Sequence, residues 1–368
     1  YVDDAGIAAP TRDIIIQFVE ALRKEGFDLE IEGDFTEYLG IKIEANSDGS
    51  REMTQVGLIK KIIDYTGLQD CNPNYVPAVQ KTLGSDPDGE LYDNKEWNYA
   101  SAVGMLQYLS NNTRPDITFA VSQVARFTHA PKQSHATALK TIVRYLKGTE
   151  KRGLVINPTG SFDIKVWCDA DFAGLHRSEP DASPDSAKSR LGFIITVGGV
   201  PLVWKSQLIQ EICLSTTMAE YASLTTAIRT LIPIRGVLDH MLKHLKLPDA
   251  QVKFVCTLFE DNAACYSLAT NQRITQRTRY FNVKWHFFWT QVKDSRTAGT
   301  DAWIGMEQCP TDMMVADILT KPLPSQIFRH HRKSTNGWDT YHRAGDQLTK
   351  PLSREAFDKA RKSIQDLE

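Results

Sequence analysis

The sequence lacks the features that mark membrane proteins, disulfide-rich proteins and strongly basic nucleic-acid binders. The apolar, uncharged run at residues 191–204 is too short to span a bilayer, and the Gly-Gly pair within it is typical of a hairpin turn. The six cysteines show no C-x-x-C spacing, which favours reduced intracellular thiols over a disulfide framework or a zinc site. Because the formal net charge is −2, a nucleic acid would have to be held by local basic patches.

Three catalytic patterns are also missing from the sequence: a glycine-rich phosphate loop, the H-E-x-x-H zinc motif and the G-x-S-x-G nucleophile elbow. The sequence does contain enough apolar residues to form large hydrophobic cores. Its 368 residues are 42% apolar, which suffices for two or three ordinary domains. We therefore expect a globular chain without a membrane segment.

The first half of the chain is expected to be mainly helical. Helical apolar spacing predicts helices over residues 11–25 and 56–67, on either side of two short strands joined by an NSDGS turn. Residues 70–95 are rich in proline, glycine and aspartate and are typical of an extended linker. Three amphipathic helices are expected to follow, near residues 96–110, 115–128 and 134–147.

From residue 160 the pattern changes to strands first and helices later. Residues 162–174 predict a strand that ends in an acidic turn, and residues 190–206 predict a hairpin. A long helix is then expected near residues 215–245. A strand at residues 252–259 and a helix from residue 261 should follow. A second helix near 280–294, a strand at 301–306 and a short helix around 312–320 complete the region. This order is typical of a mixed α/β domain with a central sheet.

Four carboxylates lie at the ends of these expected elements: Asp169, Glu220, Asp261 and Asp317. Each alone has an ordinary structural explanation. Asp169 fits an Asx turn, and Glu220 forms a capping-box pattern with Thr217. Asp261 could cap the helix that follows it, and Asp317 could be a first-turn acid that the helix dipole stabilises.

Two observations favour a common site for these acids. Glu220 lies at the edge of the apolar stripe that its helix should turn toward the sheet, where an unpaired charge is costly. The strand VKFVCTLF is apolar at nearly every position, as a buried central strand is, and the acids at its tip include Asp261. Acids at the ends of adjacent central strands should converge. About four such acids can hold two Mg²⁺ ions roughly 3.5–4 Å apart for phosphodiester cleavage.

A basic stretch at residues 132–152 contains almost no acidic residue. Its cations form either a solvated helix face or a face that contacts phosphates, and the sequence leaves both alternatives open. The candidates for contact with nucleic acid are Lys140, Arg144 and Lys147.

Eight short motifs follow one another along residues 1–333: YVDD, YLGIKIE, YASAVGMLQYLSNNTRPDITFAVSQVARF, RYLKGT, WCDADFAG, LSTTMAEYASL, EDNAACYSLATN and VADILTKPLP. In their order and approximate spacing they resemble the C-terminal part of a copia-type LTR retrotransposon polyprotein, and the resemblance covers nearly all of this range. We expect the first residue to be a cut within a longer polyprotein.

The resemblance implies four segments in this chain. Residues 1–44 resemble the end of a reverse-transcriptase palm, and residues 45–155 a mainly helical thumb and connection. Residues 160–322 resemble a ribonuclease H domain, an α/β fold with a mixed five-stranded sheet and flanking helices. Residues 323–368 are left as a C-terminal tail.

The resemblance also implies an activity. It places Asp169, Glu220, Asp261 and Asp317 as catalytic, metal-binding acids that hold two Mg²⁺ ions, or Mn²⁺, and cut the RNA strand of RNA·DNA hybrids. Other parts of the polyprotein are expected partners, no membrane is expected, and an intracellular location, in a cytoplasmic particle or the nucleus, is implied. Two alternatives stay open: a non-catalytic relic that at most binds nucleic acid, and an exonuclease of the same general fold.

The YVDD motif resembles the metal-binding hairpin of the polymerase, with Asp3 and Asp4 as two of its carboxylates. The third polymerase aspartate of the family lies upstream of this motif and is absent from the sequence. Polymerase activity is therefore not expected from this chain alone.

Two features depart from the family's pattern. Tyr280 and Asn282 stand where the family usually has a histidine and an aspartate, which leaves His286 as either a product-release group or a packing residue. From Asp346 the tail partly repeats the segment that begins at Asp317, so these two aspartates compete as the fourth ligand. We favour Asp317 because apolar residues precede it.

Overall fold

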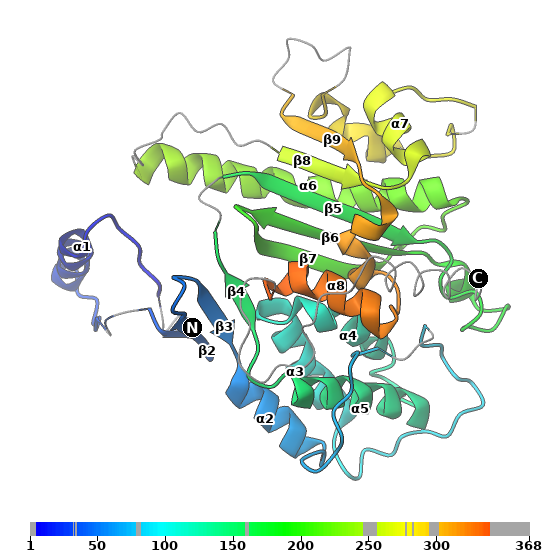
Figure 1. Ribbon diagram of the computed structural model, residues 1–368, viewed down its shortest axis with the longest axis horizontal. Coiled ribbons are helices and arrows are strands. Elements are labelled where there is room, and N and C mark those ends of the chain that lie inside the picture. Colours follow the sequence, from blue (N-terminus) through cyan, green and yellow to red (C-terminus); the bar gives the residue numbers. More distant parts are fainter. Residues whose placement is uncertain are drawn as a thin grey trace.

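The computed structural model describes residues 5–31, 33, 35–78, 82–158, 162–245, 256–276, 278–281, 283–293 and 302–338. Two β-sheets organise this part of the chain, a small antiparallel sheet and a larger mixed one, with a group of helices beside the larger sheet (Figure 1). No described helix is both long and apolar enough to cross a bilayer.

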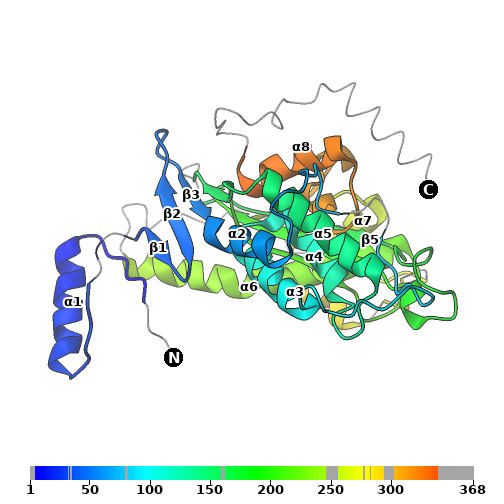
Figure 2. The same ribbon diagram turned by 90° about the horizontal axis from the view of Figure 1, so that it is seen from below.

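The small sheet contains four antiparallel strands that lie side by side in chain order: β1 (Glu37–Tyr38), β2 (Ile41–Ala45), β3 (Arg51–Thr54) and β4 (Leu154–Ile156). The hairpin of β2 and β3 is the one predicted about the NSDGS turn. There the Asp48 carboxylate accepts hydrogen bonds from the backbone and the hydroxyl of Ser50. The predicted first helix is α1 (Arg12–Lys24), which stands apart from the rest of the molecule (Figure 2).

A group of helices follows the hairpin: α2 (Val56–Tyr65), α3 (Tyr99–Asn112), η1 (Pro115–Ile117), α4 (Thr118–Ala125) and α5 (Gln133–Gly148). They confirm the helices expected in this region. Their apolar faces share one core, in which Leu106, Leu139 and Ile142 are fully buried. The apolar spacing read from the sequence is therefore the spacing that the helices bury.

The larger sheet contains β5 (Ile164–Asp171), β6 (Arg190–Val197), β7 (Val200–Leu208), β8 (Cys256–Glu260) and β9 (Ile304–Gln308), in the order β7-β6-β5-β8-β9. The first three strands are antiparallel, whereas β8 and β9 run parallel to β5. This arrangement confirms the predicted mixed five-stranded sheet with flanking helices. The predicted hairpin turn forms at Gly198 and Gly199, whose φ angles of 56° and 81° suit glycine.

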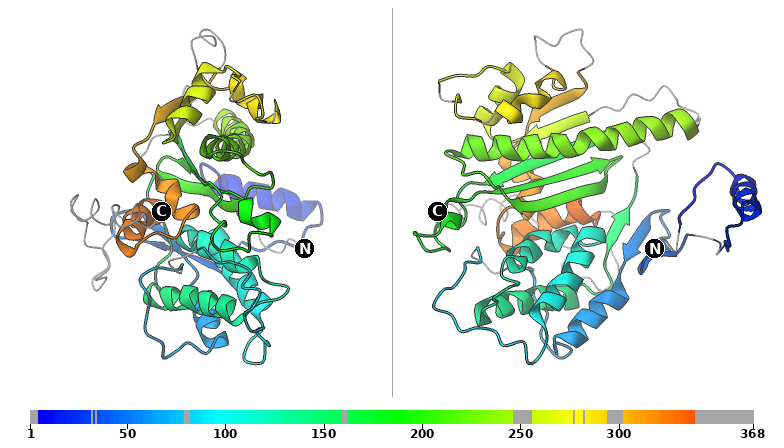
Figure 3. Two further views of the ribbon diagram at one scale, coloured as in Figure 1. Left: turned by 90° about the vertical axis from the view of Figure 1, so that its right-hand side faces the viewer. Right: turned by 180° about the vertical axis from the view of Figure 1, so that it is seen from behind.

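Both faces of the larger sheet are covered. The long helix α6 (Thr216–Leu245) runs along one face (Figure 3). Side chains of that face such as Val166 and Phe193 belong to the same core as the helix. Because side chains alternate across a strand, Trp167 and Ile194 point to the opposite face and join the core of the helical group. That face also contacts η5 (Val315–Leu319) and, beyond it, α8 (Ser325–Asn336).

Three parts of the structure differ from the sequence-based expectation. The helices expected near residues 280–294 and 312–320 are 3₁₀ segments: η3 (Val283–Thr290), then η4 (Thr311–Met313) and η5. The helix expected from residue 261 begins slightly later, as α7 (Ala263–Asn271), and a short η2 (Pro184–Ala187) precedes β6. The segment from residue 323, expected as a tail, forms the helix α8, and residues 339–368 lie outside the described residues.

A buried polar network fastens α8 to the helical group. The Asp116 carboxylate accepts hydrogen bonds from Arg114 at 2.9 and 2.8 Å, from the Tyr145 hydroxyl at 2.5 Å and from the Asn336 amide at 3.0 Å. Burial opposes the charge of Asp116, but Arg114 and these donors hold the pKa of this carboxyl below its usual range. The network holds α8 against the helical group. Because α8 follows η5 along the chain, it also restrains the position of η5.

Candidate active site

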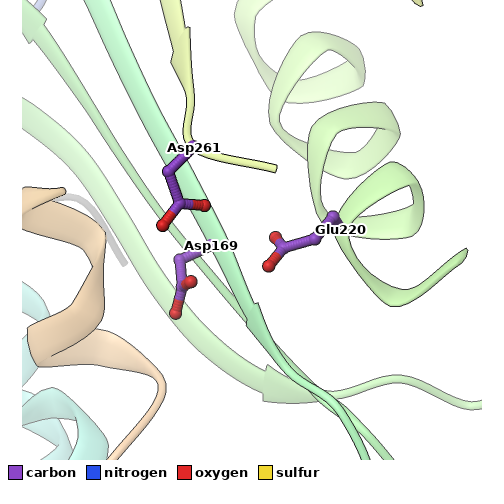
Figure 4. A group of neighbouring side chains, drawn as sticks. All are labelled: Asp169, Glu220 and Asp261. Carbon is purple, nitrogen blue, oxygen red and sulfur yellow. The ribbon is translucent and has the colours of Figure 1, made fainter. Parts of the chain in front are cut away.

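The larger sheet brings two of the predicted acids to one edge. Asp169 lies near the carboxyl end of β5, and Asp261 directly follows β8, which pairs with β5 in parallel. The carboxyl ends of parallel strands meet at the same edge of a sheet. The helix α6 adds Glu220 from its first turns. One carboxylate oxygen from each of these three residues lies within 4.8 Å of the other two, and the side chains point toward one another (Figure 4).

The fourth predicted acid lies beside this group. Asp317 belongs to η5, and the ammonium group of Lys321 links it to Asp169, at 3.1 Å from Asp317 Oδ1 and 3.6 Å from Asp169 Oδ2. The Thr320 hydroxyl also donates a hydrogen bond to Asp169 Oδ2. The structure thus gathers all four acids at one sheet edge, and Asp346, the competing residue, lies outside the described residues.

A glycine allows η5 to approach so closely. Gly192 of β6 is the register partner of Asp169 in β5. A Cβ atom at Gly192 would lie 2.6 Å from Cγ2 of Thr320 and 2.8 Å from Cβ of Leu319, closer than real Cβ atoms come. Any larger residue at this position would push the η5 segment away from Asp169.

The acids are buried and close enough to perturb one another. Asp169 is 1% exposed, Glu220 6% and Asp317 8%. Burial, followed by the charge of Asp169, raises the pKa of Glu220 well above its usual range and raises that of Asp261. Burial raises the pKa of Asp317 to about 8, although Lys321 opposes the shift. Two or more buried carboxylates that share a site in this way call for a counter-charge.

The donor set fits a hard divalent cation. Mg²⁺ and Mn²⁺ prefer oxygen ligands, and the site offers carboxylate oxygens from separate, firmly held elements. The Oε2 atom of Glu220 is buried and accepts no hydrogen bond from the described part of the chain. A buried charged atom without a partner is costly, and a bound cation would satisfy it. Asp169, Glu220 and Asp261 could therefore hold one ion, with Asp317 available for a second.

Sequence reasoning assigned no role to two residues near this site. Glu260, which precedes Asp261, is fully buried, accepts a hydrogen bond from the Asn262 backbone at 3.1 Å and lies 3.6 Å from Cys168 Sγ. Burial raises the pKa of Glu260 to about 8. Lys321 is the other residue. Its i,i+4 spacing from Asp317 is a typical ion-pair pattern and was the signal that could have found it.

His286 contacts a packing cluster. Its Nδ1 atom and the Tyr221 hydroxyl share a hydrogen bond of 2.9 Å, and Trp289 Nε1 donates to the same hydroxyl at 2.7 Å. Burial lowers the pKa of His286. These contacts favour the packing alternative. Tyr280 is exposed, and Asn282 lies outside the described residues, as do Asp3 and Asp4 of the YVDD motif.

The three candidate cations of α5 have partners within the chain. Lys140 lies 3.5 Å from Glu96 Oε2. Arg144 donates to the Asn72 carbonyl at 2.8 Å, and Lys147 donates to the Cys71 carbonyl at 2.8 Å and to the Gln69 carbonyl. Two of the three cations therefore hold the segment after α2 in place, and their contact with nucleic acid stays a prediction.

Comparisons with known proteins find relatives among transposon polyproteins. No protein-family model matches the chain. A retrovirus-related Pol polyprotein from transposon TNT 1-94 of Nicotiana tabacum is 29% identical over 335 residues, which covers 89% of this chain and 23% of the relative. The polyprotein from transposon RE1 of Arabidopsis thaliana is 27% identical over 331 residues, covering 90% of this chain and 21% of the relative. The chain is a homologue of transposon Pol polyproteins.

This Pol homologue spans less than a quarter of the length of the curated relatives that it matches. Among solved structures, it is similar to the N-terminal ribonuclease H domain of rv2228c from Mycobacterium tuberculosis, determined as a fusion with maltose-binding protein. That alignment has 14% identity and a TM-score of 0.27, and covers 55% of this chain and 99% of the solved one.

Proposed function

We propose that residues 160–322 of this chain form a ribonuclease H domain that cuts the RNA strand of RNA·DNA hybrids by a two-metal mechanism. The observation that carries the proposal is the convergence of carboxylate oxygens from Asp169, Glu220 and Asp261 within 4.8 Å. Lys321 links Asp317 to Asp169. Homology to transposon Pol polyproteins supports a role on nucleic acid.

The residues of the site would divide the work between two Mg²⁺ ions, or Mn²⁺. Such a pair activates the attacking water and stabilises the leaving oxygen of a phosphodiester. Asp169 and Asp261 would bridge or flank the ions, Glu220 would serve the leaving-group side, and Asp317 the side of the nucleophile. The closed packing of β5, β8 and α6 fixes these carboxylates before substrate arrives.

The substrate would be recognised by its shape and by its 2′-hydroxyl groups, because hybrids of any base sequence must be cut. The remaining segments would be the end of a polymerase palm at residues 1–44, the thumb and connection at 45–155 and the tail at 323–368. Other parts of a Pol polyprotein would be the partners.

The proposal is tested by cleavage of an end-labelled RNA·DNA hybrid in Mg²⁺. The intact chain should make internal cuts in the RNA strand only. Asp261→Asn should slow cleavage by at least about 100-fold, since lost metal ligation costs several kcal/mol of transition-state stabilisation. The control is Asp239→Asn, on the exposed side of α6, where the carboxylate pairs only with Arg235 among the described contacts, at 3.2 Å.

Any other result of this assay would favour a different function for the chain. Equal RNA cleavage by the intact chain and Asp261→Asn would contradict the site, and no cleavage by either would indicate a non-catalytic relic. Release of mononucleotides from strand ends, without internal cuts, would indicate an exonuclease.

A further inference from the structure

A lysine ammonium group occupies part of the acidic site. Lys321 Nζ lies 3.1 Å from Asp317 Oδ1 and 3.6 Å from Asp169 Oδ2, and its side chain is 34% exposed. The other two acids of the site, Glu220 and Asp261, belong with Asp169 to the group whose oxygens lie within 4.8 Å. Asp169 is therefore shared by two cation positions, one of which already holds a positive charge.

The short turn after η5 sets this arrangement. Asp317 supplies the acid, and the Thr320 hydroxyl and the Lys321 ammonium group both reach back to Asp169 Oδ2. The backbone N–H of Lys321 donates to the Asp317 carbonyl at 3.2 Å, which places the two residues one turn apart, so that the ammonium group can reach the acid. Any ion held between Asp169 and Asp317 must therefore meet the ammonium group.

We propose that Lys321 competes with the second divalent ion for the position between Asp169 and Asp317, so that the two ions bind with unequal affinity. This inference rests on the proposed two-metal function. The first ion would bind at Asp169, Glu220 and Asp261. The second would enter only when the lysine side chain swings out.

The chemistry of the side chain suits this exchange. An ammonium group is a compact single charge on a flexible four-carbon stem, so it can neutralise the paired acids and still leave. Its partial exposure gives it a path to solvent. In the metal-free protein the same contact offsets the repulsion between Asp169 and Asp317, which otherwise stand unpaired in a buried site.

The experiment is a titration of the full chain with Mn²⁺ alone, in which electron paramagnetic resonance measures the free ion. The intact chain should show one tight and one weak class of site. Lys321→Met should tighten the weak class by at least about tenfold, the change expected when one ion pair no longer has to break. The affinity of the tight class should rise less than that of the weak class, because the tight site shares only Asp169 with the described lysine pairs.

Two further variants make the result specific. Lys321→Arg keeps the charge and should leave the weak class weak. Lys188→Met removes a lysine that pairs with the half-buried Asp185 at 2.7 Å, away from the acidic site, and should change neither class. Circular dichroism shows whether each variant is folded, and if Lys321→Met is not, Lys321→Gln replaces it with the same expected tightening.

The outcomes separate this inference from the proposed function. Two Mn²⁺ ions of equal affinity in the intact chain, or a neutral variant whose weak class is unchanged or weaker, would overturn the role of Lys321 and leave the nuclease proposal standing. No binding of Mn²⁺ by the intact chain would overturn both, because the acids would then hold no ion.

Discussion

At the scale of single residues, the site is costly to the folded protein when no cation is bound. Glu220 is buried, its Oε2 atom has no hydrogen-bond partner among the described residues, and burial together with the charge of Asp169 raises its pKa. Buried like charges of this kind favour function at the expense of stability. Removal of one charge should therefore stabilise the metal-free chain.

We expect Glu220→Gln to raise the free energy of unfolding by about 1–2 kcal/mol in EDTA at pH 8. The pKa of Glu220 is raised on folding, so the intact chain loses stability as the pH rises above the unfolded value near 4.5. Glutamine has no such loss, and its advantage should therefore be smaller at pH 4. Urea unfolding at both pH values measures the difference.

The matched control for this prediction is Asp239→Asn on the same helix, which should change stability by less than about 0.5 kcal/mol. Excess Mg²⁺ should raise the free energy of unfolding of the intact chain by more than it raises that of the Glu220→Gln variant. A Glu220→Gln variant that is less stable than the intact chain in EDTA would contradict this view of the site.

The convergence of the four acids could be expected from the sequence because each lies near an end of a recognisable element. Asp261, for example, ends a continuous apolar run, and such a run indicates a central strand. Lys321 was missed because its i,i+4 spacing from Asp317 indicates only a local ion pair. Its importance comes from Asp169, a residue of a distant strand that the sequence alone does not place beside it.

At the scale of the elements, α8 supports the site from behind η5. Its Arg332 donates to the Tyr145 hydroxyl at 3.1 Å and lies over the Trp338 ring, at 4.6 Å from the centroid. Its His331 is 2% exposed, and burial lowers the pKa of this imidazole to about 3. Because two basic residues of α8 are buried, the stability of this helix depends on contacts with residues that are distant in the sequence.

His331 should make stability depend on pH. Its folded pKa lies below the unfolded value near 6.5, so its contribution is complete above that value and is lost as the pH falls toward 3. Between pH 7 and pH 5 the intact chain should lose about 1–2 kcal/mol more than His331→Gln, at up to about 1.4 kcal/mol per pH unit.

Urea unfolding at the two pH values measures this difference, and His129→Gln, at an exposed position, is its control. Parallel pH profiles for the intact chain and His331→Gln would show that the imidazole does not remain neutral in the folded state.

The sequence predicted the helices and strands whose apolar residues repeat with a clear period, such as α5 and the hairpin of β6 and β7. It did not predict α8, because the segment RHHRK reads as a solvated tail although His331 and Arg332 are buried. The C-terminal glycine of this helix, Gly337 at a φ of 68°, was the available signal. The short strand β4 has too few residues to show a period.

At the scale of the whole molecule, the helical group and the larger sheet form a continuous structure. Trp204 of β7 donates to the Ser110 carbonyl at 2.8 Å, and Arg190 of β6 donates to the Ser122 hydroxyl at 2.8 Å. Ile194 of β6 and Leu319 of η5 share the core of the helical group. The face that positions η5, and with it Asp317, is thus held by residues from both halves of the chain.

The most direct test of this account is a crystal structure of the chain grown with Mn²⁺, with anomalous diffraction used to locate the ion. We predict a strong anomalous peak ligated by Asp169, Glu220 and Asp261, at the edge where β5, β8 and α6 meet. Well-diffracting crystals with no peak at these carboxylates, or with Glu220 turned away from both aspartates, would contradict it.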